Sequence, residues 1–501
     1  MKSDSLHKLI QALDEGEYRY CRETLTKGES PHTEAKLKLF DLLSEMNPFD
    51  SKQIKLALSD STIAKNLAVE KTRMFQQLLN SIRTLHAKRS EANDPFRRLA
   101  EGKVLMELSL HDEAEEVVLK GLKYATESEQ LLAELALRDL LRVIYKNVSN
   151  SKQGEKKIDN EYKMETTSRK LSSLVKYTNL NDRAYDYLSR YSASNKGEAQ
   201  RGMDELINHP ELQDINLANS LPAQQRFYNT WNFYHASRNE QELSLAAALR
   251  VIDLWHSNPK HVSLNTAPYI GHLGSVIGKL INLKRFPEAL ELLKRLEKLE
   301  VKGRRNLRTK FTALEIRYQI YFMNSGKLEK TLDREQIVND GLRKFGRSIK
   351  DGPKLTLLYN FGVTHLLLGK SKDALKCFSR IKDFGELRDR TDLQGVSRLI
   401  RLLLLESSNN TLHFGHFLRT NKRFLAKKDR AYVLEGLVYD WLHKQHKLVG
   451  RAERRASYGE FANKIQPLVA EGVIGSEEIY IWATAQQKNT NPMNVLNEMA
   501  G

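Results

Sequence analysis

The feature that most constrains the fold is a spacing of small residues in LLYNFGVTHLLLGKSKDALKCF, residues 357–378. Helical periodicity places Gly362 on one face of a first helix, and it places Ala374 and Phe378 on the facing side of a second. Gly369 and the polar residues after it form the turn between them. Because a small residue on each helix lets the backbones approach closely, the segment predicts two tightly packed helices joined by a short turn.

Related patterns recur along the chain. Gly102 and Ala114 have the same twelve-residue separation, and residues 273–293 read as another helix, turn and helix. The separation between Trp231 and Pro259 also fits a unit of this kind. The pattern resembles the tetratricopeptide repeat, a helix–turn–helix unit of about 34 residues. The resemblance implies an all-α solenoid, in which stacked repeats form a superhelix with a long concave surface.

Composition agrees with a helical protein, since only 11 prolines and 26 glycines interrupt 501 residues. Two cysteines are too few for a disulfide framework and fit a reducing compartment. No stretch approaches the about 20 apolar residues of a membrane helix. The N-terminal residues lack the apolar core of a secretory signal. We therefore expect a cytoplasmic protein without a membrane span.

Breaks in the pattern divide the chain into three parts. Residues 1–90 read as four helices of an N-terminal domain, which either caps the array or holds a helix-turn-helix with its second helix at 66–79. The tetratricopeptide-like solenoid is predicted at 91–470, with a candidate hinge in the polar segment at 149–161. Residues 471–501 are expected to form a last helix and a frayed tail.

Motifs for cofactor or metal chemistry are incomplete. The GKS at 369–371 has Thr364 where a phosphate loop requires glycine, and GHLGSVIGKL at 271–280 has Leu273 at that place. Two histidines in HKQH, at 443–446, lack accompanying carboxylates or cysteines. We therefore expect no cofactor, no metal and no catalytic activity. An enzyme assembled from residues of distant repeats is the third alternative.

The resemblance also implies where a partner would bind, since the first helix of each tetratricopeptide repeat lines the groove. Those positions map to Tyr359 and Val363 in one repeat and to Asn229 and Asn232 in another. Asparagine side chains could hold the backbone of an extended peptide, and the tyrosine could supply an anchor. The alternative is that these residues contact the next repeat. The leading hypothesis is a non-catalytic scaffold or adaptor that binds a protein or peptide.

The charge distribution supplies a second hypothesis. Residues 301–460 contain 34 Lys and Arg against 17 Asp and Glu, an excess equal to the whole net charge of +17. Such a segment could meet phosphates, so a nucleic-acid-binding regulator is the alternative function. Solvated helix surfaces are the simpler explanation of the same charges. The candidate basic residues are Arg304, Arg305, Arg308, Lys310, Lys422, Arg423, Lys427, Lys428, Arg451, Arg454 and Arg455.

Overall fold

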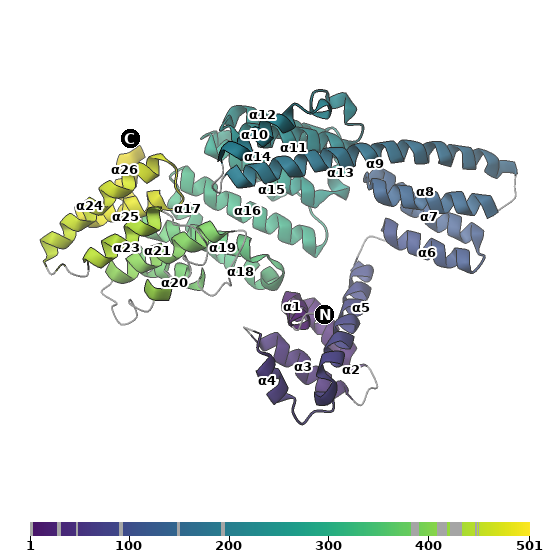
Figure 1. The fold of residues 1–501 in the computed structure, drawn as a ribbon, viewed down its shortest axis with the longest axis horizontal. Helices are drawn as coiled ribbons and strands as arrows, with labels where there is room; N and C mark the ends of the chain where they lie inside the picture. Colours follow the sequence, from purple (N-terminus) through teal and green to yellow (C-terminus); the bar gives the residue numbers. More distant parts are fainter. Residues whose placement is uncertain are drawn as a thin grey trace. The chain divides into compact units, whose positions relative to one another are not determined.

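The computed structural model confirms an all-α protein (Figure 1). It describes residues 4–27, 32–46, 49–89, 94–147, 151–191, 196–381, 390–407, 418–420, 433–445, 448 and 450–500. In those residues every regular element is an α-helix or a short 3₁₀ turn. The chain divides into two compact units, Met1–Lys310 and Phe311–Gly501. The region predicted as one solenoid therefore spans parts of both units.

The N-terminal helices enclose a core of their own, built from residues such as Leu6, Phe40, Ile54 and Met74. Five α-helices are present where four were predicted. They are α1 (Ser5–Ala12), α2 (Glu15–Thr26), α3 (Thr33–Glu45), α4 (Ser51–Ala57) and α5 (Leu67–Arg89), with a 3₁₀ turn at Ala64–Asn66.

The extra helix is α2, whose sequence EGEYRYCRETLT is strongly polar. Its start is fixed by a capping box, in which the Asp14 carboxylate accepts the backbone N–H of Glu17. In return, the Glu17 carboxylate accepts the backbone N–H of Asp14 at 2.8 Å. Cys21 and Leu25 then face the domain core. Tyr18 and Arg22 each donate to the Asp41 carboxylate of α3 at 2.9 Å, so core packing and polar contacts together hold the helix.

The rest of the first unit is a series of packed helices, several of them paired as antiparallel hairpins. They are α6 (Pro95–Glu107), α7 (His111–Glu127), α8 (Leu131–Asn147), α9 (Ser151–Tyr191), α10 (Lys196–Ile207), α11 (Leu221–Ser237), α12 (Gln241–His256), α13 (Pro259–Leu264), α14 (Thr266–Asn282) and α15 (Phe286–Lys298), with 3₁₀ turns at Pro210–Leu212 and Ile215–Leu217. The next helix, α16 (Arg304–Asn324), runs across the boundary between the units.

The proposed hinge is wrong where the structure describes it, because residues 151–161 belong to the 41-residue helix α9. Its first half packs on α8 and its second half on α10 and α11 (Figure 1). Asn160 anchors the first half by donating to the backbone carbonyl of Arg138 at 2.9 Å. The ion pair between Lys163 and Asp159, one helical turn apart, supports the exposed side. A polar segment without proline has thus formed helix instead of a linker.

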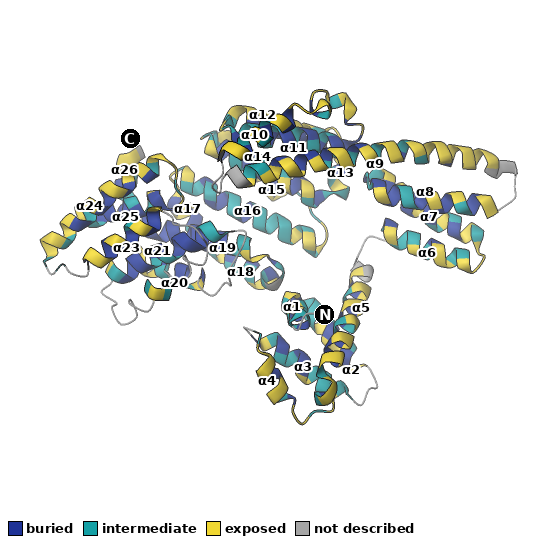
Figure 2. Cartoon of the chain, viewed as in Figure 1, coloured by how far each residue is buried: buried dark blue, intermediate teal, exposed yellow. Residues whose placement is uncertain are grey.

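The second unit contains the helix pair predicted from Gly362. Its elements are α17 (Leu328–Asp333), α18 (Glu335–Phe345), a 3₁₀ turn at Gly346–Ser348, α19 (Asp351–Leu367), α20 (Ser371–Ile381), α21 (Thr391–Ser407), α23 (Val433–Gln445), α24 (Arg451–Ala470), α25 (Ser476–Lys488) and α26 (Pro492–Ala500). The region expected to form a single last helix holds two, α25 and α26. Every residue of α19 from Leu355 to Leu367 is buried (Figure 2).

One turn geometry recurs between successive helices in both units. The residue two places after a helix end has positive φ, at Ser109, Glu129, Asn239, Lys284, Gly326 and Gly369. The N–H of the following residue then donates to a carbonyl five residues back, as Lys370 does to His365 at 2.8 Å and Arg285 to Leu280 at 2.8 Å. A helix end closed by two backbone hydrogen bonds of this kind is the Schellman motif. Gly369 of the GKS tripeptide is therefore a helix-end residue, as the sequence indicated.

We expect opposite effects from two substitutions in this turn. Gly369→Ala should destabilise the second unit by about 1 kcal/mol, because φ is +74° and the new Cβ would lie 2.8 Å from Asn491 Nδ2. Lys284→Gly should stabilise the first unit by about 0.5–1 kcal/mol, because the exposed lysine holds φ at 58°. Urea unfolding of the full chain measures the stability of both variants. If both variants were destabilised, or both stabilised, the positive-φ turn would not be what decides their effect.

Candidate functional site

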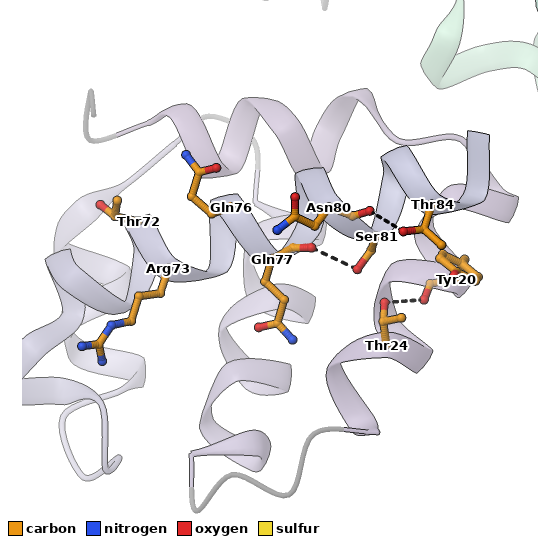
Figure 3. A pocket seen from close by; sticks show the side chains of 9 residues that line it. All are labelled: Tyr20, Thr24, Thr72, Arg73, Gln76, Gln77, Asn80, Ser81 and Thr84. Carbon is orange, nitrogen blue, oxygen red and sulfur yellow. Dashed lines mark hydrogen bonds between the residues drawn. The ribbon is translucent and has the colours of Figure 1, made fainter. Parts of the chain in front are cut away.

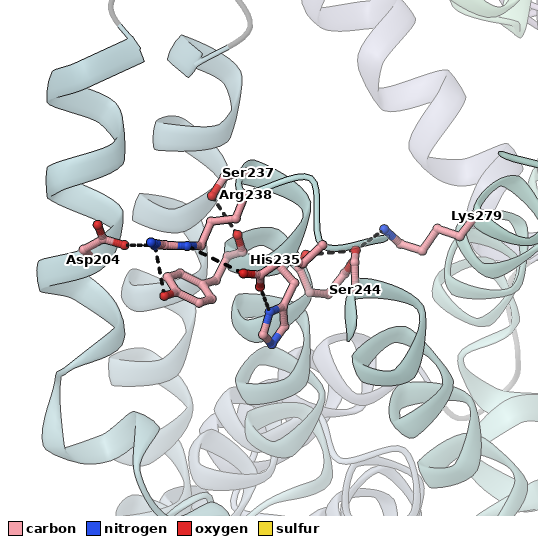
Figure 4. Close-up of polar contacts among 9 residues, drawn as sticks. Asp204, His235, Ser237, Arg238, Ser244 and Lys279 are labelled. Atoms are coloured by element: carbon pink, nitrogen blue, oxygen red, sulfur yellow. Dashed lines mark hydrogen bonds and ion pairs between the residues drawn. The ribbon is translucent and has the colours of Figure 1, made fainter. Parts of the chain in front are cut away.

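Polar side chains from α11, α12 and α14 form two hydrogen-bonded groups, one around Ser244 and one around His272. We call Asn229, Asn232, Ser244, His272 and Lys279 the polar cluster. Ser244 is fully buried, and its hydroxyl donates to the Asn232 side-chain oxygen at 2.9 Å. Lys279 Nζ in turn donates to Ser244 Oγ at 2.5 Å (Figure 4). A chain of hydrogen bonds thus links α14 to α11 through α12.

Lys279 is the cation of this cluster. It is the only Lys, Arg, Asp or Glu in α14, and it is half-buried among apolar neighbours. Desolvation by burial lowers the pKa of its ammonium group. No carboxylate in the described ranges lies within ion-pair distance of Lys279 Nζ, so its hydrogen bond to Ser244 is to a neutral group. A desolvated cation without a counter-ion favours the approach of an anion.

His272 holds the other end of the polar cluster. Trp255 Nε1 donates to His272 Nδ1 at 2.9 Å, and the Asn229 amide lies 3.2 Å from His272 Nε2. Since an indole can only donate, Nδ1 accepts and the neutral ring carries its proton on Nε2. Burial first, and then the charge of Arg226, lowers the pKa of His272 to about 4. The ring is therefore neutral near pH 7, and its Nε2–H can donate to the Asn229 side-chain oxygen once the amide is turned so that this oxygen, and not Nδ2, faces the ring.

This arrangement predicts loss of stability in acid. The unfolded chain takes up the histidine proton first as the pH falls, so the stability due to neutral His272 is complete above pH 6.5 and lost toward pH 4. The shift corresponds to an upper limit of about 3–4 kcal/mol at 1.36 kcal/mol per pH unit. Urea unfolding followed across this pH range should show the loss, and His272→Gln should reduce it. An equal acid sensitivity in the variant would contradict the prediction.

A second group of polar residues lies nearby, and each basic side chain in it contacts a carboxylate (Figure 4). Arg238 donates to Asp204 at 2.9 Å and lies over the Tyr234 ring, 5.3 Å from its centroid. His235 Nδ1 is 2.6 Å from a carboxylate oxygen of Glu240. The first pair joins α10 to the turn between α11 and α12, and the second joins α11 to the same turn. These pairs differ from Lys279 in that Arg238 and His235 each have a carboxylate partner, which indicates a structural role.

No family model, curated protein or solved structure matches this chain. The resemblance to tetratricopeptide repeats therefore rests on the residue spacings and on the helix pairs that they predicted. Among the described residues, no group of three or more His, Cys, Asp or Glu side chains could hold a metal ion. None of the helices in the same residues is long and apolar enough to cross a membrane.

Three of the four predicted groove residues are enclosed. Val363 is 1% exposed, Tyr359 is 5% exposed and Asn232 is 4% exposed. Tyr359 donates to Glu478 of α25 at 3.2 Å, so it joins two helices of the unit. Asn229 is half-buried against His272 of the next hairpin. The assignment of Asn232, Tyr359 and Val363 to an open groove is therefore wrong, because Tyr359 contacts α25 and Asn232 contacts α12 of its own hairpin.

The predicted basic residues divide among three situations. In the first unit, Arg304 lies 3.0 Å from the Asp14 carboxylate, and Lys310 donates to the carbonyls of Glu297 and Leu299 at the end of α15. Arg305 is exposed, and Arg308 is half-buried. The lysine closes a helix C-terminus, which is a structural role. Residues Lys422, Arg423, Lys427 and Lys428 lie outside the described residues.

The remaining basic residues lie at the start of α24 in the second unit. Arg451 and Arg455 are exposed one turn apart, and Arg454 donates to the Leu448 carbonyl at 3.1 Å. The described members of the basic set thus belong to two different compact units.

The helix proposed to read DNA is α5, whose outward face forms an open groove with α2 of about 780 Å³ (Figure 3). Its lining is mostly hydroxyl and amide, from Tyr20, Thr24, Thr72, Arg73, Gln76, Gln77, Asn80, Ser81 and Thr84. The one charged side chain in that lining, Arg73, pairs with Glu70 at 2.7 Å. This face has hydrogen-bonding capacity but little net charge, and a role in reading DNA stays a prediction.

Sequence analysis missed Lys279 and His272. The signal for both was present, because TAPYIGHLGSVIGKLIN contains one charged residue and one histidine within an apolar helix. A polar side chain at such a position needs a hydrogen-bond partner, which either the protein or a bound ligand supplies.

Proposed function

We propose that the protein is a non-catalytic scaffold that binds an acidic segment of a partner protein at the polar cluster. The carboxylate of the partner would approach Lys279, and the Asn229 amide would hold the adjacent peptide backbone. The observation that carries the proposal is the desolvated ammonium of Lys279, which has a hydroxyl as its neighbour in place of a carboxylate.

The surroundings of Lys279 support this role. Ser244 and Asn232 are buried and fix one donor of the ammonium, which leaves two N–H groups for a ligand. His272 is held by Trp255, so Asn229 has a defined orientation before any ligand arrives. Such preorganisation reduces the entropic cost of binding a flexible peptide.

A displayed library of random peptides tests the proposal directly. The full chain should enrich peptides that contain Asp or Glu, and Lys279→Gln should lose that enrichment. For a selected peptide we expect at least a tenfold weaker affinity in the variant, since removing one partner of a desolvated charge pair costs about 2–5 kcal/mol. Lys279→Gln should fold at least as well as the parent, because a desolvated charge is removed.

The matched control is Lys284→Gln, which removes an exposed lysine just after the same helix. It should retain the acidic enrichment. Selection of peptides without acidic residues, or equal binding by Lys279→Gln, would argue against the polar cluster as the binding site.

A nucleic-acid-binding regulator is the second candidate function. It is favoured by Arg451 and Arg455, which are exposed on one side of α24 in the most basic part of the chain. Binding driven by phosphate contacts would weaken steeply with salt. Titration of fluorescent single-stranded RNA at several salt concentrations tests this function, and binding that is absent or independent of salt would rule it out.

A further inference from the structure

Helix α6 carries an exposed apolar stripe. Phe96 is 51% exposed, Val104 is 54% exposed and Leu108 is 63% exposed, and Ala100 lies exposed between them. The four residues follow at intervals of four, so they form one continuous ridge on the helix. We call Phe96, Ala100, Val104 and Leu108 the α6 stripe.

The opposite face of α6 is already packed. Gly102 is buried, and a Cβ there would lie 2.5 Å from Val118 of α7. The α6 stripe points away from α7, and α6 is the first helix of the hairpin series in the first unit. The outermost helix of a repeat array normally has a polar outer face. An apolar ridge at this position therefore indicates a surface that another helix covers.

The helix before α6 in the sequence is a poor match for the stripe. The outward face of α5 bears Thr72, Gln76, Asn80 and Thr84, which are polar. Most of its apolar residues, including Met74 and Leu78, are used in the N-terminal core. The large apolar side chains that α5 leaves exposed are Val69 and Leu79, which do not form a row. Burying the α6 stripe against that outward face would desolvate amide groups without giving them partners.

A second α6 stripe is a better match in both shape and charge. Ridges formed by every fourth residue interdigitate with one another at a crossing angle of about −50°. One edge of the stripe carries Arg97 and Glu101, which lie 3.5 Å apart. The other edge carries Lys103 and Glu107. In an antiparallel copy the same edges face each other, so each basic residue can approach an acidic residue of the second chain.

We propose that the protein forms a homodimer through the α6 stripe, with two antiparallel copies of α6 crossing at Ala100. The contact is isologous, because the same residues are used on both chains. It is separate from the polar cluster, so it can hold even if Lys279 binds no peptide.

Sedimentation of the full chain tests the dimer. The parent protein should sediment at twice the chain mass of 57.7 kDa. Val104→Glu should sediment at the chain mass, because each new carboxylate would be buried against Phe96 of the second chain. The control is Val175→Glu on α9, which changes a valine of nearly equal exposure, 51%, and should leave the dimer intact.

Cross-linking tests the register independently of any loss of folding. Ala100→Cys should give a disulfide-linked dimer under mild oxidation, while Val175→Cys should not, since the native Cys21 and Cys377 are buried. A parent protein that sediments as a single chain would overturn the proposal. So would a dimer that persists in Val104→Glu or fails to cross-link through Ala100→Cys, since either result would place the contact on another surface.

Discussion

Replacing Arg334 by alanine should destabilise the second unit by about 3–5 kcal/mol, the usual cost of removing one partner of a buried ion pair. Arg334 donates two hydrogen bonds to the Glu315 carboxylate, both at 2.7 Å. The Glu315 side chain is only 3% exposed, and the guanidinium lies 4.1 Å from the centroid of the Tyr318 ring. The variant would leave Glu315 as an uncompensated buried charge.

Hydrogen exchange of the full chain followed by mass spectrometry measures this loss separately in each unit. Peptides from residues 335–381 should lose protection, while peptides from the first unit supply an internal control. The double variant Glu315→Leu with Arg334→Met should recover most of the stability, because apolar residues of similar volume often replace a buried pair without cost. Equal destabilisation by the single and double variants would show that packing, and not the unpaired carboxylate, dominates.

The sequence was most informative where backbone geometry restricts the residue type. Gly362 and Ala374 marked a close helix contact, and Gly369 marked the turn at the end of the first helix. Both predictions were confirmed: a Cβ at Gly362 would lie 2.7 Å from the Phe378 ring, and Gly369 has a φ of +74°. A larger residue would meet a steric penalty at either glycine. At Ser109 and Lys284 the same turn contains no glycine, so nothing in the sequence indicated it. These residues adopt positive φ in spite of the conformational cost.

The groove residues were misplaced because the fold of a single repeat does not fix its neighbours. Tyr359 and Val363 were assigned to an open face, yet α19 also contacts α21, α25 and α26. The sequence LTLLYNFGVTHLL contains no Asp, Glu, Lys or Arg, and its threonine and asparagine side chains are buried as well, as expected of a helix enclosed on every side. Lys279 was not predicted as a site residue, because a single charge in an apolar helix forms no periodic pattern that would indicate a function.

Replacing Phe378 by alanine should destabilise the second unit by about 3–5 kcal/mol, as expected for removal of a buried aromatic side chain. Phe378 is 1% exposed, and its ring packs over Gly362 and edge-on to Tyr359 at 6.1 Å between centroids. In the parent protein, Gly362→Ala should cost about 1–3 kcal/mol, because the new Cβ would lie 2.7 Å from the ring.

The two substitutions should be strongly coupled. Once Phe378→Ala has removed the ring, an alanine at 362 meets open space and gains up to about 1 kcal/mol of helix propensity over glycine. Gly362→Ala should therefore change from destabilising to stabilising between the two backgrounds, which a double-mutant cycle by urea unfolding can measure. Gly271→Ala is the control, because no atom lies within 4 Å of its Cβ position and its effect should be the same in both backgrounds. An additive cycle at Gly362 would mean that the helices separate to admit the methyl group, so that the small residue is not what sets the spacing of α19 and α20.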